Sequence, residues 1–240
     1  MTMLLYYVRH GDPIYDPDSL TPLGQEQAKA LAKRLIVHGV DKVYSSPSNR
    51  AQLTARPLCD LLKKELHICP WADEALAAQD FMIIREDTGY NWSFFDAELV
   101  ALFNSPEVFA LGEQWYEYPA FEKYNFAKGV KRVNEAVDNF FLELGYRHDR
   151  ENHRYEVVTP NHGRVALFAH QGFAMSFFSS MLDIPYPQFS THYDFSHSSL
   201  SVIQFTELGG YIYPKVLQSS GDSHLYREGL LTGYNNGIKF

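Results

Sequence analysis

Residues Leu4 to Pro13 read LLYYVRHGDP, and this stretch decides the fold expected for the chain. Its first five residues are apolar or aromatic without a polar break, which is typical of a strand buried on both faces of a parallel sheet. The strand then ends at Arg9, His10 and Gly11. Because open α/β sheets bind ligands at the carboxyl ends of their strands, we expect Arg9 and His10 to lie at a binding edge, where Gly11 allows close approach of the backbone.

The side chains at this strand end suit phosphate chemistry. A guanidinium offers a planar fork of donors to phosphoryl oxygens, and a neutral imidazole is a nucleophile that can form a covalent intermediate. Arg9 could equally form an ion pair and His10 a buried hydrogen bond. Three residues alone do not decide between these interpretations, so the rest of the chain has to be considered.

Two further strand ends carry the same kinds of side chain. Residues 43–55 read VYSSPSNRAQLTA, a short apolar strand followed by a helical pattern with Arg50 in its first turn, where helix amides favour an anion. Residues 165–172 read VALFAHQG, an apolar strand that ends at His170. Three separate strand ends therefore carry Arg, His or both.

As a set, these motifs resemble the histidine phosphatase superfamily, which includes cofactor-dependent phosphoglycerate mutases and many small-molecule phosphatases. Their order and spacing fit that family from residue 3 to about residue 205. The matching pieces are Arg9-His10-Gly11, Thr21-Pro22-Leu23-Gly24 with Gln27-Ala28, Ser45-Ser46-Pro47 with Arg50-Ala51 and Thr54-Ala55, and His170 after its strand.

The resemblance implies phosphoryl transfer through a phosphohistidine, with His10 as the nucleophile. Three other side chains are expected to neutralise the phosphoryl oxygens, namely Arg9, Arg50 and His170. Two more residues are expected to contact substrate, namely Thr21 and Gln171. In the family a glycine usually follows the second histidine directly, whereas here Gln171 stands between His170 and Gly172.

A carboxylic acid is also expected, because the leaving alkoxide needs a proton and the attacking water needs a base. In similar proteins this acid follows the third strand. Glu74 is best placed in that region, Asp80 is its rival and Asp73 is the third candidate. The family's usual Leu-x-Glu, followed by Phe-Gly and Trp-Glu-Gly, is absent here, so the choice stays open.

The alternation of strands and helices up to Pro70 predicts an α/β fold, a three-layer αβα arrangement with a mostly parallel sheet. Thr21 is the expected N-cap of the first helix, with Pro22 at its first position. Regular periodicity then stops, and residues 75–125 are expected to form an aromatic-rich helical lid over the strand ends. The whole chain, residues 1–240, is expected to be one domain carrying this insertion.

Composition excludes several classes of function. The net charge of -8 opposes binding to nucleic acid or to an anionic membrane, so we expect neither as a partner. The two cysteines, Cys59 and Cys69, form no disulfide framework or metal-ligand pattern, and the histidines show no metal motif. The sequence shows no leader peptide and no apolar run long enough to cross a membrane, so a cytoplasmic location is expected.

The function predicted from these observations is metal-independent hydrolysis of a small phosphomonoester, without a cofactor. The expected partner is a small phosphorylated substrate, and the oligomeric state is left open. Two alternatives stay open as well. One is a phosphoglycerate-type mutase, and the other is a phosphate-binding module without turnover.

Overall fold

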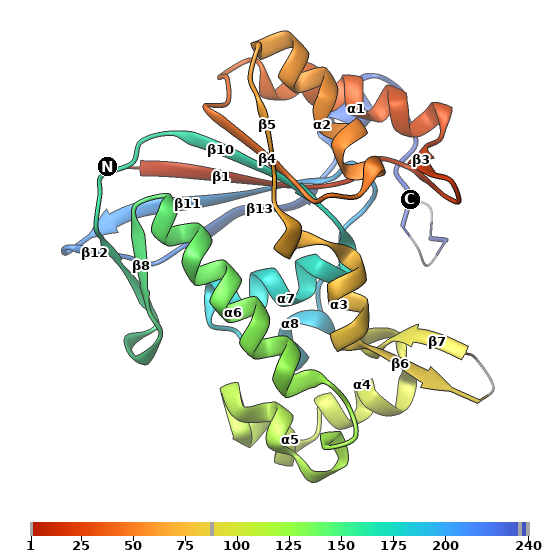
Figure 1. The fold of residues 1–240 in the computed structure, drawn as a ribbon, viewed down its shortest axis with the longest axis vertical. Helices are drawn as coiled ribbons and strands as arrows, with labels where there is room; N and C mark the ends of the chain where they lie inside the picture. The colour runs from red at the N-terminus through yellow and green to blue at the C-terminus, as the bar shows by residue number, and fades with distance from the viewer. Residues whose placement is uncertain (1, 87–88, 235–236, 239–240) are drawn as a thin grey trace. The chain divides into compact units, whose positions relative to one another are not determined.

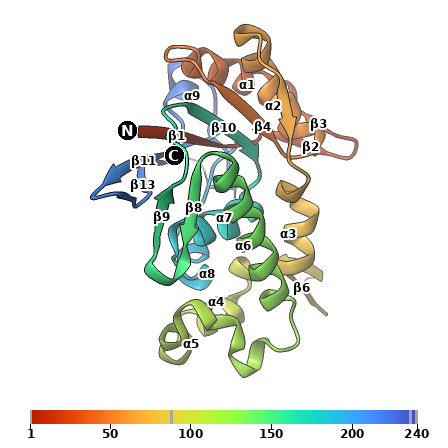
Figure 2. The same cartoon turned by 60° about the vertical axis from the view of Figure 1, so that its left-hand side comes forward.

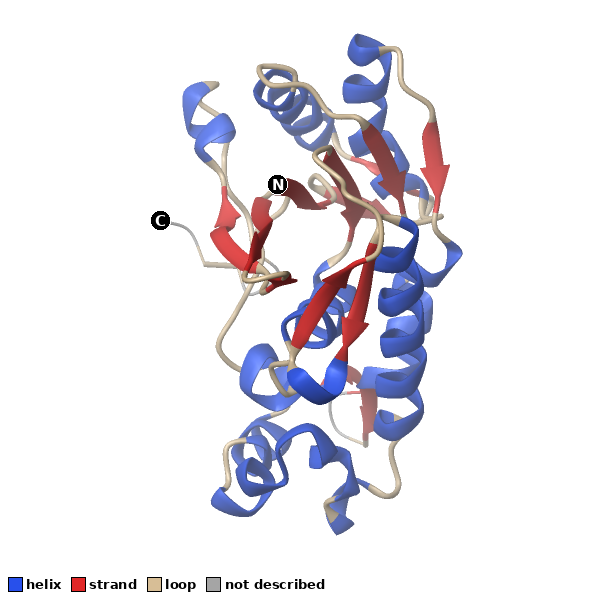
Figure 3. Ribbon diagram, turned by 90° about the vertical axis from the view of Figure 1, so that its left-hand side faces the viewer, coloured by secondary structure: helices blue, strands red, loops and turns tan. Residues whose placement is uncertain are grey.

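A computed structural model describes residues 2–86, 89–234 and 237–238 (Figure 1). The chain divides into two compact units. The first comprises Met1–Asp73, Thr159–Gln171 and Phe195–Phe240, and the second comprises Glu74–Val158 and Gly172–Asp194. The first unit is built on a sheet, whereas the second is mainly helical (Figure 3).

Four neighbouring parallel strands form one side of the sheet in the first unit. They lie in the order β5 (Leu66–Ile68), β4 (Lys42–Ser45), β10 (Arg164–Ala169) and β1 (Thr2–Arg9). The predicted α/β class with a mostly parallel sheet is thereby confirmed. The apolar run before Arg9 becomes β1, whose last five residues are all buried.

Antiparallel strands extend this sheet on the other side of β1. There β1 pairs with β11 (Leu200–Leu208), which pairs in turn with β13 (Lys215–Gly221) and β12 (Tyr211–Ile212). Because β11 runs opposite to β1, the start of β11 lies beside the carboxyl end of β1, with Leu200 opposite Val8. Residues that precede β11 are therefore brought to the predicted binding edge.

Two long helices cover one face of the sheet in the first unit, α1 (Pro22–Leu35) and α2 (Asn49–Leu62) (Figures 1 and 2). Thr21 caps α1 as predicted, because its Oγ1 accepts a hydrogen bond from the N–H of Gly24 at 3.0 Å. The short hairpin β2 (Pro13–Tyr15) and β3 (Asp18–Leu20) precedes α1.

The apolar residues of this face form the core of the first unit. Both helices contribute to it, and the sheet contributes side chains from four strands. The buried members are Tyr6, Val8, Leu31, Ala32, Leu35, Val40, Val43, Ala55, Leu58, Cys59, Ala166, Phe168 and Leu200.

The second unit contains most of the remaining helices and two hairpins. Its longest helix is α6 (Phe126–Glu143), and the hairpin of β8 (Tyr146–Asp149) and β9 (Arg154–Val157) runs beside it (Figure 2). The other elements are α3 (Glu74–Phe81), β6 (Met82–Arg85), β7 (Gly89–Trp92), α4 (Ala97–Phe103), α5 (Pro106–Leu111), α7 (Gln171–Leu182) and α8 (Tyr186–Ser190), with Gln171 of α7 counted in the first unit.

Short segments complete the secondary structure of both units. The first unit also contains the helix α9 (Ser223–Arg227) near the end of the chain. Single 3₁₀ turns lie at Pro70–Ala72, Ser93–Phe95, Gly112–Glu117, Pro119–Phe121 and Arg150–Asn152.

Aromatic side chains of residues 75–125 pack into the core of the second unit. Phe103, Trp115 and Phe121 are buried, and the ring of Trp115 stacks on Tyr186 with centroids 5.5 Å apart. These rings therefore stabilise the unit. The lid role expected for residues 75–125 stays a prediction, and residues 87–88 of that range lie outside the described part.

Among the described residues, no helix is both long enough and apolar enough to span a bilayer.

Candidate active site

Three neighbouring parallel strands place the predicted phosphate-binding side chains at one edge of the first unit. His10 directly follows β1, His170 directly follows β10, and Ser46 directly follows β4. The register pairs Arg9 with Ala169 and Phe168 with Ser45, so the three strand ends lie level with one another. The ring centroids of His10 and His170 are 5.2 Å apart.

The imidazole of His10 is held in one tautomer. Its Nδ1 lies 2.8 Å from the carbonyl oxygen of Gly11, and because a carbonyl only accepts hydrogen bonds, Nδ1 must carry the proton. Burial lowers the pKa of His10 well below its ordinary value of 6.5, and its neighbours His170, Arg9 and Arg50 lower it further. His10 is therefore neutral near pH 7, with the lone pair on Nε2.

His170 is held by two partners from the β4–α2 segment. Nη2 of Arg50 donates to its Nδ1 at 3.3 Å, so Nδ1 accepts and the proton is on Nε2. Nε2 then donates to Oγ of Ser46 at 2.7 Å. Nη1 of Arg50 forms an ion pair with Asp18 at 2.8 Å, which fixes the guanidinium against the β2–β3 hairpin.

Arg9 is buried, with only 1% of its surface exposed, and partners before β11 orient it. Its Nη1 donates to the carbonyl oxygen of Phe195, and its Nη2 donates to Nε2 of His197 at 2.8 Å. The ring of His197 also lies 5.7 Å from that of His10, measured between centroids. His197 is thus part of the site, although the sequence did not indicate it.

Gly11 is required because of a close backbone approach. A Cβ at this position would lie 2.7 Å from the carbonyl oxygen of Gly24, at the start of α1. The N–H of Gly11 donates to Oγ1 of Thr54 at 2.9 Å, and that hydroxyl donates to the carbonyl of Arg50 at 2.8 Å. The turn after His10 is therefore packed against α1 and α2.

Thr21 and Gln171 lie at helix starts in the first unit. The hydroxyl of Thr21 caps α1 and donates to Oδ2 of Asp12 at 2.6 Å. Gln171 opens α7 directly after His170 and is 3% exposed. Their expected contacts with substrate stay predictions.

The three candidate acids differ in their surroundings. In the second unit Glu74 opens α3, and its Oε1 accepts a hydrogen bond from the N–H of Phe173 at 3.3 Å. Asp80, also in the second unit, is 3% exposed and forms an ion pair with Nε of Arg132 at 2.7 Å. Asp73 is the last residue of the first segment of the first unit, just after the turn at Pro70–Ala72.

The second unit also brings together three possible metal ligands, Glu113, His153 and Asp183. Asp183 already accepts hydrogen bonds from His148 at 2.9 Å and from Arg150 at 3.3 Å. The positive charge of Arg150 and the hydrogen bonds that Asp183 already accepts oppose cation binding, so these three residues fit a metal ion poorly.

Comparison with known proteins identifies relatives of this chain. The family model of the histidine phosphatase superfamily (branch 1) matches residues 5–88. Putative phosphoserine phosphatase 2 of Hydrogenobacter thermophilus is 33% identical over 168 residues, which are 66% of this chain and 72% of that protein. Phosphoserine phosphatase 1 of the same organism is 30% identical over 135 residues, 56% of each protein.

Solved structures share the fold at lower identity. The mycobacterial glucosyl-3-phosphoglycerate phosphatase has a TM-score of 0.58 and 16% identity, over 92% of this chain and all (100%) of that chain. A phosphoserine phosphatase mutant from Entamoeba histolytica, in complex with phosphoserine, has a TM-score of 0.58 and 15% identity, over 93% and 99% of the two chains. At these identities the similarity shows the fold alone.

Proposed function

This chain belongs to the histidine phosphatase superfamily, and from that premise we propose that it hydrolyses a small phosphomonoester through a phosphohistidine on His10. Membership rests on the family model and on a relative 33% identical, 72% of which is covered by this chain. It confirms the predicted family and, with it, the predicted enzyme class, a phosphatase of the histidine type. The mechanism, the residue roles and the substrate are the proposal.

In the first step, Nε2 of His10 attacks phosphorus and the bond from phosphorus to the ester oxygen breaks. Glu74 donates a proton to the leaving oxygen, which departs as an alcohol. In the second step, the Glu74 carboxylate takes a proton from water, whose oxygen attacks phosphorus. The bond between phosphorus and Nε2 then breaks, inorganic phosphate leaves, and His10 and Glu74 return to their starting states.

Three other side chains stabilise the charge on the transferred group. Arg9 and Arg50 are cations whose charges act on His10, and His170 lies next to it. Oriented cations and hydrogen-bond donors around a phosphoryl group lower the barrier mainly by electrostatic stabilisation.

The tautomer of His10 is the observation that carries the proposal. The bond from Nδ1 to the carbonyl of Gly11 leaves the lone pair of Nε2 available, and the lowered pKa keeps the ring neutral. A protonated imidazole has no lone pair to attack with. A buried histidine with only a packing role would need neither the adjacent guanidinium of Arg9 nor the second histidine beside it.

The contacts of the two carboxyl groups favour Glu74 over Asp80 as the proton donor. Asp80 is committed to Arg132 and buried, so it would have to give up a charged partner in order to carry a proton. Glu74 accepts from the N–H of Phe173, three residues after His170 in the sequence. We therefore propose Glu74 as the proton donor.

The names of the relatives guide the choice of substrate. Two relatives are named phosphoserine phosphatases, and one similar structure is named a glucosyl-3-phosphoglycerate phosphatase. The phosphate esters in these names also carry a carboxylate. A phosphomonoester of a small hydroxy acid or of serine is therefore the first class to test.

The test measures phosphate release from phosphoserine, 3-phosphoglycerate and 4-nitrophenyl phosphate in the presence of a chelator. We compare the native chain with His10→Ala and, as a matched control, with His162→Ala, because His162 is exposed. Activity should survive chelation and the control change, and should fall by about 1,000-fold or more in His10→Ala. Mass spectrometry under alkaline conditions should find a phosphoryl group on His10.

Other outcomes point to other functions. Unchanged activity in His10→Ala would contradict the assignment of the nucleophile. Isomerisation of phosphoglycerate much faster than phosphate release would favour a mutase. Binding of phosphate without turnover of any ester would favour the module that has lost activity.

A further inference from the structure

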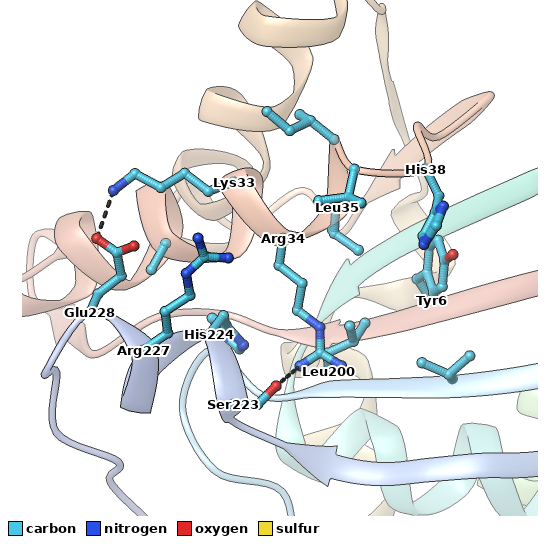
Figure 4. Close-up of a pocket in the computed structure, with 14 residues that line it drawn as sticks. Tyr6, Lys33, Arg34, Leu35, His38, Leu200, Ser223, His224, Arg227 and Glu228 are labelled. Carbon is cyan, nitrogen blue, oxygen red and sulfur yellow. Dashed lines mark hydrogen bonds and ion pairs between the residues drawn. The ribbon is translucent and has the colours of Figure 1, made fainter.

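A cavity of about 880 Å³ opens in the first unit between α1 and α9, on the face of the sheet that these helices cover (Figure 4). Its apolar part is formed by Tyr6 of β1, Leu35 of α1, and Leu200 and Val202 of β11. The volume falls within the range of pockets that hold small organic molecules. The lining contains none of the residues assigned above to phosphoryl transfer.

Hydrogen bonds on two sides tie α9 to α1 and give the cavity a defined wall. Nζ of Lys33 forms an ion pair with Glu228 at 2.6 Å, and Nη1 of Arg34 donates to Oγ of Ser223 at 2.6 Å (Figure 4). Nη2 of Arg34 also donates to Oε1 of Gln218 in β13 at 2.7 Å. Two walls of the cavity, α1 and α9, are therefore bonded to each other, and α1 is also bonded to β13.

Arg34 is a partly buried cation with neutral partners. Both of its hydrogen bonds go to a hydroxyl or an amide, and it forms no ion pair among the described residues. Burial lowers the pKa of Arg34, and the charges of Tyr6 and Asp222 offset only part of this effect. A guanidinium in this position gains free energy when an anion comes into contact with it.

Arg227 adds a second cation to the same cavity. Figure 4 shows Arg34 extending from α1 toward α9, and Arg227 extending from α9 toward α1. In the part of the chain that the structure describes, Arg227 has no hydrogen bond and no ion pair. Lys33 is neutralised by Glu228, so the lining keeps an excess of positive charge from Arg34 and Arg227, on a chain whose net charge is -8.

His224 of the lining leaves this balance unchanged. Burial lowers the pKa of His224 to about 4, so its ring is neutral near pH 7. Nε2 of His224 lies 3.3 Å from Oγ of Ser198. His224 therefore adds no positive charge to that of Arg34 and Arg227 at neutral pH.

We propose that this cavity is a second binding site, for a small organic anion with an apolar body, whose acidic group contacts Arg227 beside Arg34 while its body lies on Ile36, Val37 and Val202. The guanidinium fork of Arg227 matches the oxygens of a carboxylate, sulfonate or phosphate, and Arg34, whose two Nη atoms already donate to neutral partners, adds positive charge. Ile36 and Val37 are exposed, so the ligand removes their apolar area from water. An inorganic ion would leave that area exposed and should bind more weakly.

The test uses 1-naphthoate as the probe and uncharged 1-naphthamide as its matched counterpart, with binding measured by isothermal titration calorimetry. Naphthoate should bind with a dissociation constant in the millimolar range or tighter, and the amide about tenfold more weakly. The double variant Arg34→Gln/Arg227→Gln should lose about tenfold or more in affinity for naphthoate. Its phosphatase activity should match that of the native chain.

Controls separate this site from the catalytic centre and from general charge effects. The double variant Arg56→Gln/Arg147→Gln removes the same charge from exposed positions elsewhere and should bind naphthoate as the native chain does. His10→Ala should also bind it unchanged. Arg227 forms no hydrogen bond or ion pair among the described residues, so Arg227→Gln alone should keep the native melting temperature and still lose affinity for naphthoate.

Several results would overturn the proposal. Equal affinity for the acid and the amide would show that the cations do not take part. Native affinity in Arg34→Gln/Arg227→Gln would place the probe elsewhere, and lost affinity in His10→Ala would place it at the catalytic centre. A native chain that binds no naphthoate in the millimolar range would also contradict the site.

Discussion

Nη2 of Arg9 lies 2.8 Å from Nε2 of His197, and this hydrogen bond defines which ring nitrogen of His197 carries the proton. Because a guanidinium only donates, Nε2 of His197 must accept, so the proton is on Nδ1, which lies 3.5 Å from Oδ1 of Asp12. Arg9 is thus directed by a neutral histidine on one nitrogen and by the carbonyl of Phe195 on the other. His197 is a positioning residue for the guanidinium beside the nucleophile.

His197→Ala should lower kcat/KM for the best phosphomonoester by about 10- to 100-fold, because a misdirected guanidinium stabilises the transition state less well. His197→Gln keeps an acceptor and should restore part of the loss. His192→Ala, at an exposed position, is the matched control. If His197→Ala lowers only the melting temperature and leaves kcat and KM unchanged, the residue acts in packing alone.

The site residues that follow the parallel strands were predictable from the sequence for a physical reason. An unbroken apolar run followed by a polar residue marks the end of a buried strand, and the ends of parallel strands meet at one edge. His10 after β1 and His170 after β10 follow this rule, and their rings do lie side by side. Arg50, in the first turn of the helix after β4, reaches His170 for the same reason.

His197 was missed because it reaches the edge differently. It belongs to an irregular segment before β11, which pairs antiparallel with β1, so the start of that strand lies beside the end of β1. The orientation of a late strand is not encoded in its own apolar pattern. An antiparallel assignment for residues 200–208 would have placed His197 beside Arg9.

The second unit was the least predictable part of the chain. Residues 82–85 and 89–92 pair as the antiparallel strands β6 and β7, although the aromatic-rich region showed only weak periodicity. Its aromatic rings pack on one another across several short elements, as Phe103 does on Trp115 and Phe121. Packing of that kind depends on tertiary contacts and leaves no regular spacing in the sequence.

The decrease of kcat/KM at low pH should follow the protonation of His10. Protonation of Nε2 removes the attacking lone pair, so kcat/KM falls as the pH drops through the pKa of His10 in the free enzyme. Burial and the nearby charges lower that pKa well below 6.5, so the decrease should lie clearly below pH 6.5. Measuring kcat/KM from about pH 4 to about pH 8 tests this. A midpoint at or above the ordinary histidine value would contradict the buried environment of His10.

Glu74 and Asp80 can be separated by the leaving group. Loss of the proton donor should slow cleavage of an alkyl ester such as phosphoserine far more than cleavage of 4-nitrophenyl phosphate, because the nitrophenol leaving group departs as an anion. Glu74→Gln should therefore slow the phosphorylation of His10 by phosphoserine, measured in a single turnover, by about 100-fold or more and leave phosphorylation by the aryl ester nearly unchanged, whereas hydrolysis of the phosphohistidine should be slower with both substrates. Asp80→Asn should instead lower the melting temperature, since it leaves Arg132 without its buried partner. The reverse pattern would make Asp80 the acid.

His148 should make the stability of the folded chain depend on pH. Its side chain is fully buried, with Nδ1 3.0 Å from Asp138 and Nε2 2.9 Å from Asp183. Burial alone would lower the pKa of His148, but the hydrogen bonds to the two carboxylates outweigh it and raise the pKa above the ordinary 6.5. Both ring nitrogens carry protons in this state, because each faces a carboxylate that can only accept.

A histidine whose pKa is raised by folding stabilises the native state fully below its unfolded pKa, and the contribution disappears as the pH rises through its folded pKa. The free energy of unfolding should therefore fall as the pH increases above about 6.5. His148→Gln should cost about 3 kcal/mol at low pH, since two carboxylates lose a buried charged partner, and less at high pH. Denaturant titrations of the native chain, His148→Gln and the exposed control His162→Gln measure these differences. A destabilisation by His148→Gln that is equal at all pH values would show that the histidine is neutral in the folded protein.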